Sequence, residues 1–149
     1  MEDTLIALLE TYGYPVIRQG SLAPDAAYPA TFFTFWNNSD VERSAYDNAT
    51  ALVVWEFDVN VYSNDPSTTY SLLAQARDAL KAAGWQTPDR GHDLASDEIT
   101  HTGRGITVTY LGTVPEPEPE PEPTPGPEPE PEPTPEPEEG STEEPGTGE

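Results

Sequence analysis

The sequence contains no cysteine, which excludes disulfides, thiolate zinc sites and cysteine nucleophiles. It also lacks a long apolar run. The stretch from Leu5 to Leu9 is too short for a membrane span or the core of a signal peptide, and acids rather than bases precede it. These absences predict a protein that is made and kept in a cytoplasm and that has no membrane partner.

Basic residues are scarce, with six Lys and Arg against 28 Asp and Glu. The bases are spread singly along the chain as Arg18, Arg43, Arg77, Lys81, Arg90 and Arg104. An acidic chain without a basic patch repels phosphate. We therefore expect no sequence-specific binding to nucleic acid.

The acidic charge divides the chain into two parts. Residues 115–149 hold 13 Glu and 13 Pro but no base and no aromatic residue, which leaves 15 acids and all six bases in residues 1–114. The formal charge is thus −9 for residues 1–114 and −13 for the tail. All the Trp, Tyr and Phe residues lie before the tail. We predict one folded domain over 1–114 and a tail that cannot build a core.

The tail alternates Pro and Glu, which favours a disordered or polyproline conformation stretched by charge repulsion. Residues 115–137 would span about 70 Å at roughly 3.1 Å per residue. A solubilising spacer is the simpler interpretation. The alternative is an acidic Pro-rich ligand that docks a partner.

The clearest strand signal runs from Ala51 to Ser63. Apolar side chains occupy every second position from Val53 to Val61, as on one face of a strand. The other face becomes polar only from Glu56 onward, so we expect the first half to be covered on both sides. This strand is predicted to be the centre of the sheet.

Caps, periodicity and turn residues predict the remaining elements. In chain order they are a helix capped by Asp3, strands at 15–18 and 30–36, a helix over 66–83 between Asp65 and Gly84, a short strand within 85–97, and a hairpin over 98–111 that turns at Gly103-Arg104. The order α-β-β-β-α-(β)-β-β predicts an α+β fold, with a small mixed, mainly antiparallel sheet and two helices on one face.

Residues 37–50 are polar and longer than a simple hairpin turn requires. Long loops in compact domains are often binding elements. We therefore interpret this segment as a loop and as the contact arm of the protein.

Few residues offer catalytic chemistry. His92 stands beside Asp93, which suggests a base with its orienting acid or half of a metal site, but neighbours in a loop do not converge by default. Glu56 and Asp58 share a strand face like the paired carboxylates of some hydrolases, although such a face is usually just solvated. Nucleophile-elbow and phosphate-loop motifs are missing. We expect no enzyme activity, no metal site and no cofactor.

Several short segments together resemble one protein family. They are Gly13-Tyr14-Pro15-Val16, Phe32-Phe33-Thr34-Phe35, Asp47-Asn48, Val59-Asn60-Val61-Tyr62-Ser63 and Ala83-Gly84-Trp85. Over residues 1–112 their order and spacing are similar to the tail-completion or tail-terminator proteins of long-tailed bacteriophages, also called minor tail or minor capsid proteins. The Pro-Glu tail departs from this pattern, because the core family does not require it.

The resemblance implies a structural virion protein at the head–tail interface, assembled in the host cytoplasm. Such proteins form a homo-oligomeric ring, typically a hexamer, on the major tail tube protein. The ring ends tube polymerisation and offers a docking surface to the head completion or connector protein, and DNA only passes through its lumen. Our candidates for subunit or tube contacts are Arg43, Asp47, Asn48, Glu56, Asp58 and Arg104.

Two rival functions remain open. One is a cytoplasmic adaptor whose acidic Pro-rich arm docks a partner while the folded body serves as an anchor. The other is a small hydrolase or metal-dependent enzyme, which the residue inventory supports least.

Overall fold

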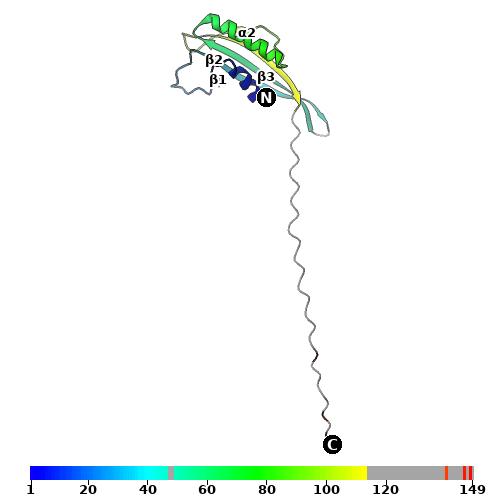
Figure 1. Ribbon diagram of the computed structural model, residues 1–149. Coiled ribbons are helices and arrows are strands. Elements are labelled where there is room, and N and C mark those ends of the chain that lie inside the picture. Colours follow the sequence, from blue (N-terminus) through cyan, green and yellow to red (C-terminus); the bar gives the residue numbers. More distant parts are fainter. Residues whose placement is uncertain (47–48, 114–139, 141–145, 147, 149) are drawn as a thin grey trace. The chain divides into compact units, whose positions relative to one another are not determined.

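The computed structural model describes residues 1–46 and 49–113, together with residues 140, 146 and 148 (Figure 1). Met1–Glu116 form one compact unit. The predicted disordered or polyproline tail lies outside the described residues, apart from three isolated positions.

The described residues form two helices and one five-stranded sheet. In chain order the elements are α1 (Glu2–Glu10), β1 (Val16–Arg18), β2 (Thr31–Tyr46), β3 (Ala49–Ser63), α2 (Pro66–Ala82), β4 (His92–Leu94) and β5 (Thr102–Thr113). The strand order across the sheet is β1-β2-β3-β5-β4, in which β1 pairs with β2 in parallel and the other pairs are antiparallel. The predicted α+β fold with a mixed, mainly antiparallel sheet is confirmed.

Strand β3 lies at the centre of the sheet, between β2 and β5, as its alternation predicted. The side chains of Phe57, Val59 and Val61 are almost fully buried on one face. The expectation for the other face was wrong. Val54 in the first half is only half-buried, whereas Asn60 in the second half is buried and donates to Thr34 at 3.3 Å.

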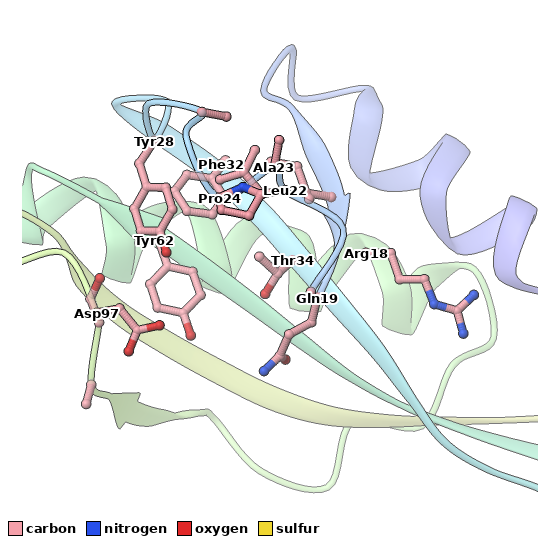
Figure 2. A pocket seen from close by; sticks show the side chains of 15 residues that line it. Arg18, Gln19, Leu22, Ala23, Pro24, Tyr28, Phe32, Thr34, Tyr62 and Asp97 are labelled. Carbon is pink, nitrogen blue, oxygen red and sulfur yellow. The ribbon is translucent and has the colours of Figure 1, made fainter.

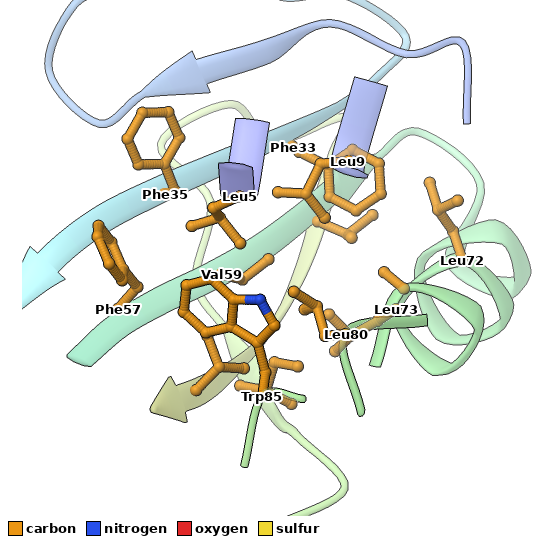
Figure 3. Packing of buried hydrophobic residues seen from close by; sticks show 14 residues of the cluster. Leu5, Leu9, Phe33, Phe35, Phe57, Val59, Leu72, Leu73, Leu80 and Trp85 are labelled. Carbon is orange, nitrogen blue, oxygen red and sulfur yellow. The ribbon is translucent and has the colours of Figure 1, made fainter. Parts of the chain in front are cut away.

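Both helices contribute to one hydrophobic core on the same face of the sheet as Phe57 (Figure 3). The buried side chains of α1 are Leu5 and Leu9, and the apolar ones of α2 are Leu72, Leu73, Ala76 and Leu80. Trp85, just after α2, is buried in this core, with its ring at 68° to the ring of Phe57. Both described helices therefore pack on this face, and neither covers the opposite face of the sheet.

The helix ends agree only partly with the sequence signals. Asp65 caps α2 by accepting the Ser67 amide at 3.1 Å, and Pro66 occupies the first turn. Gly84 follows the helix with a φ of 91°, a conformation that favours glycine. Asp3, however, is not a cap: α1 begins at Glu2 after Met1, and Asp3 lies in its first turn, where an acid favours the helix dipole.

Residues 37–50 do not form the predicted loop. Strand β2 continues to Tyr46 and β3 begins at Ala49, so the segment is a long antiparallel hairpin whose tip lies outside the described residues. The register shifts three times in this hairpin, first between Asn37 and Ser39. Each β-bulge reverses which face a side chain occupies, and this conceals the alternation that identifies a strand.

Gly103-Arg104 is not a turn either, because β5 runs without interruption from Thr102 to Thr113. Gly103 and Gly105 lie in this strand where a side chain would collide with the neighbouring strand. A Cβ on Gly103 would meet the ring of Tyr62, and a Cβ on Gly105 would meet the amide of Asn60. Here glycine provides room for side chains of β3 rather than a change of direction.

Candidate functional site

The sheet face opposite the helices is the candidate functional surface, and we call it the open face. Residues paired across adjacent strands share a face, so the register identifies its members. On the three central strands they include Phe32, Thr34, Trp36, Ser39 and Val41 of β2, Leu52, Val54, Glu56, Asp58, Asn60 and Tyr62 of β3, and Thr107, Thr109, Leu111 and Thr113 of β5.

Large apolar side chains are exposed on this face. Trp36 is 48% exposed, Val41 40% and Leu111 52%, and Tyr28 is exposed above the Phe32 end. These are four of the seven exposed large hydrophobic side chains among the described residues. Val41, Val54 and Leu111 form one cross-strand row. Clustered exposed apolar residues on one face indicate an interaction surface.

The two carboxylates singled out from the sequence, Glu56 and Asp58, lie on the open face between these apolar residues. Both are half-buried, and Asp58 accepts a hydrogen bond from the Thr107 hydroxyl at 2.7 Å. Trp36 is the cross-strand partner of Asp58. None of the open-face side chains named above is basic, so this surface is both apolar and acidic.

A cavity of about 370 Å³ opens at one end of the open face (Figure 2). Tyr28, Phe32 and Tyr62 gather on one side of it, with Phe32 and Tyr62 stacked at 5.4 Å between ring centroids. Gln19 and Asp97 add polar groups. Its size falls within the usual range for a small ligand or an inserted side chain.

The polar groups near the cavity are used to hold the structure together. His101 shares a hydrogen bond of 2.9 Å with the Pro29 carbonyl, which ties the loop before β2 to the start of β5. Burial raises the pKa of the Tyr62 hydroxyl, and the nearby Asp97 and Tyr28 raise it further. That hydroxyl is therefore kept protonated and suits hydrogen bonding rather than proton abstraction.

The predicted contact residues divide into three groups. Glu56 and Asp58 come together on the open face, whereas Arg43 is exposed beside a β-bulge of β2. Asp47 and Asn48 lie outside the described residues. Arg104 is not at a hairpin tip and is 18% exposed at its side chain. Because Arg104 bonds internally to Asp93, Gly91 and Tyr70, it presents little free charge to a partner.

The sequence reasoning missed two features. The first is the cavity, for which the aromatic residues Tyr28 and Phe32 around a Pro-rich loop were the available signal. The second is a group of bases at the end of α2. Arg77 donates to the Asp89 carbonyl at 2.7 Å and so holds the following loop, with the exposed Arg90, against the helix that carries Lys81. Arg77 also pairs with the Asp78 carboxylate at 3.4 Å.

Within residues 1–46 and 49–113, no group of three His, Asp or Glu side chains is arranged to hold a metal ion. Neither described helix is both long and apolar enough to cross a membrane. No protein-family model matches the chain, and no curated protein shows significant similarity to it. The function must therefore be argued from the surface itself.

Proposed function

We propose that the protein is a structural assembly subunit that acts as an oligomer rather than as an enzyme. The exposed apolar side chains of the open face carry this proposal. Helices cover one face of the sheet, while Trp36, Val41 and Leu111 remain exposed on the other. Burial of such a surface against a protein partner is favourable, and its removal from water stabilises an assembly.

Within this class, we propose a ring that terminates the tail tube of a long-tailed bacteriophage. The order of motifs over residues 1–112 supports this choice, and the α+β fold in the described residues is compatible with it. The ring would sit on the major tail tube protein, stop its polymerisation and present a docking surface to the head completion protein. The long β2–β3 hairpin offers an arm for these contacts.

Electrostatics are also compatible with a ring around a DNA channel. Residues 1–114 carry a formal charge of −9. An acidic lining repels genome phosphates, so DNA slides through without adhering. Acidic proteins are common, and this argument is therefore secondary to the open face.

Light scattering after size exclusion tests the proposal. We expect a discrete ring-sized species at high protein concentration, or after addition of the purified major tail tube protein, and ring-shaped particles in negative-stain micrographs. Addition of the protein should also stop tube growth. A strict monomer under all of these conditions would contradict the ring.

A further inference from the structure

We propose that the open face of one copy packs against the helix side of the next copy, with Glu56 and Asp58 facing Lys81 and Arg90. The inference rests on the proposed ring and specifies its subunit contact. Three observations lead to it. They are which bases are paired within the subunit, the position of Glu56 and Asp58 on the sheet face opposite Lys81, and the composition of the two surfaces that would meet.

The first observation concerns which bases are already neutralised within the subunit. Arg18 pairs with Glu2 at 3.1 Å, Arg77 with Asp78 at 3.4 Å and Arg104 with Asp93 at 2.6 Å. Lys81 and Arg90, like Arg43 on β2, are exposed and form no ion pair with any residue in the described part of the chain. Because each body carries a charge of −9, two copies repel each other unless the contact places bases opposite acids.

The second observation is that the two open-face carboxylates and the unpaired Lys81 lie on opposite sides of the sheet. Glu56 and Asp58 lie on the open face, whereas Lys81 is exposed on α2, which packs on the other face. Two open faces brought together would place four carboxylates against one another. The favourable arrangement is therefore head-to-tail, and a head-to-tail contact forms a ring when its rotation closes after a whole number of subunits.

The third observation is the match between the two surfaces. The open face offers Trp36, Val41 and Leu111 around its carboxylates. The outer side of α2 exposes the small residues Ser71 and Ala74, which permit a sheet to approach closely, and also Tyr70 and the carboxylate of Asp78, which is paired with Arg77. Lys81 lies in the last turn of α2, where the negative end of the helix dipole also stabilises a base. That effect does not explain why Arg90 is unpaired or why the open face is uncovered.

The size of the surface predicts how tightly two copies hold together. Residues 52–58 of β3, which precede the buried Asn60, span about 20 Å at roughly 3.3 Å per residue, and three strands are about 14 Å wide. The flat area is thus about 280 Å², which is well below the roughly 800 Å² per partner of a standard interface. One contact alone is weak, whereas ring closure gives every subunit two contacts. We therefore expect cooperative assembly that depends on concentration.

Thiol cross-linking gives the most direct test, because the natural chain has no cysteine. Glu56→Cys and Lys81→Cys are made as separate full-length variants, mixed under ring-forming conditions and treated with a short bis-maleimide. We expect cross-linked dimers only in the mixture, and a ladder up to ring size from the double variant. Asp25→Cys, in the exposed loop beside the cavity, replaces Lys81→Cys in the matched control and should yield no dimer.

Charge reversal gives an independent readout. Glu56→Lys with Asp58→Lys should raise the concentration needed for assembly by about a hundredfold, because like charges then face each other. Adding Lys81→Glu and Arg90→Glu should restore assembly. Circular dichroism and thermal melting confirm that each variant is folded.

The outcomes separate this inference from the proposed function. If the wild type never forms a ring, the proposed function fails and the contact fails with it. If the wild type forms rings but the mixture does not cross-link and charge reversal has no effect, only the contact is wrong. If Glu56→Cys alone forms cross-linked dimers, two open faces meet each other. If Glu56→Cys cross-links only to the tube protein, the open face binds that partner instead. Either result overturns the proposal.

Discussion

Arg104 is held by three groups at once. Its guanidinium pairs with the Asp93 carboxylate at 2.6 Å, donates to the Gly91 carbonyl at 2.8 Å and lies 4.4 Å from the centre of the Tyr70 ring. These contacts join β4, β5, α2 and the loop between α2 and β4. A single side chain thereby fastens the edge strand β4 to the rest of the sheet.

We expect Arg104→Ala to lower the free energy of unfolding by about 1–2 kcal/mol, because a partly desolvated cation over an aromatic ring contributes on that scale. Arg104→Lys should recover only part of the loss, since an ammonium cannot reproduce the planar guanidinium contacts. Urea denaturation monitored by fluorescence measures both variants. Equal stability of Arg104→Ala and the wild type would show that these contacts are not stabilising.

Phe57 is the residue on which the core depends most clearly. It is 1% exposed and packs edge-on against Trp85 at 5.9 Å between ring centroids. We expect Phe57→Ala to cost about 3–5 kcal/mol, from lost burial and from the cavity left behind. Trp55→Ala should cost less, because Trp55 is only partly buried. Leu111→Ala, a control on the open face, should stay within about 0.5 kcal/mol in the same denaturation experiment.

At the scale of elements, α2 depends on its cap. The Asp65 carboxylate accepts hydrogen bonds from the Thr68 hydroxyl at 2.6 Å and from the Ser67 amide at 3.1 Å. These bonds, that of Thr68 first, lower the pKa of Asp65 from its ordinary value of 3.8. A carboxyl group with a lowered folded-state pKa stabilises the fold above its unfolded pKa, and this contribution is lost as the pH falls through the folded value.

We therefore expect Asp65→Ala to be less stable than the wild type at about pH 7, and the difference to shrink below about pH 4. Denaturant midpoints measured across this pH range provide the check. Asp65→Asn retains a side-chain acceptor without the charge, so its deficit at about pH 7 should be smaller, and it should also shrink as the pH falls because both variants lack the titrating carboxyl. A pH-independent deficit for Asp65→Ala would mean that the charge of the cap plays no part.

The elements show where sequence patterns succeed and where they fail. The span of α2 was predicted closely because Asp65, Pro66 and Gly84 act locally on its ends. The outer part of β2 was missed because polar residues have low strand propensity and the bulge after Asn37 reverses the alternation. Its strand conformation comes from pairing with β3, which is a non-local interaction.

At the scale of the whole molecule, the folded body and the tail make separate predictions. We expect deletion of residues 115–149 to leave the melting temperature and ring assembly of the body unchanged, because the tail has no apolar side chain larger than proline to bury. Thermal melting and light scattering of the shortened chain measure this. If the shortened chain no longer assembles, the tail is not merely a spacer. If it still assembles but no longer binds a partner that the full chain binds, the adaptor function is favoured.

The candidate site could be predicted only in part. The alternation in β3 placed Glu56 and Asp58 on one face together, and the structure agrees. The exposed apolar residues around them could not be assigned to that face, because this required the register of β2 and β5 against β3. Arg104 was assigned to the surface on the basis of a Gly-X pair that turned out to lie within a strand.

The sequence by itself determined the properties that depend on composition and on near neighbours. These are the division into an aromatic-rich body and a Pro-Glu tail, the central strand and the capped second helix. Only the tertiary structure decided which sheet face is covered, which bases are neutralised internally and that Glu56 and Asp58 lie on the face opposite Lys81. Such properties arise from contacts between residues far apart in the chain. No local pattern specifies them, so the open face could be recognised only once the strands were paired.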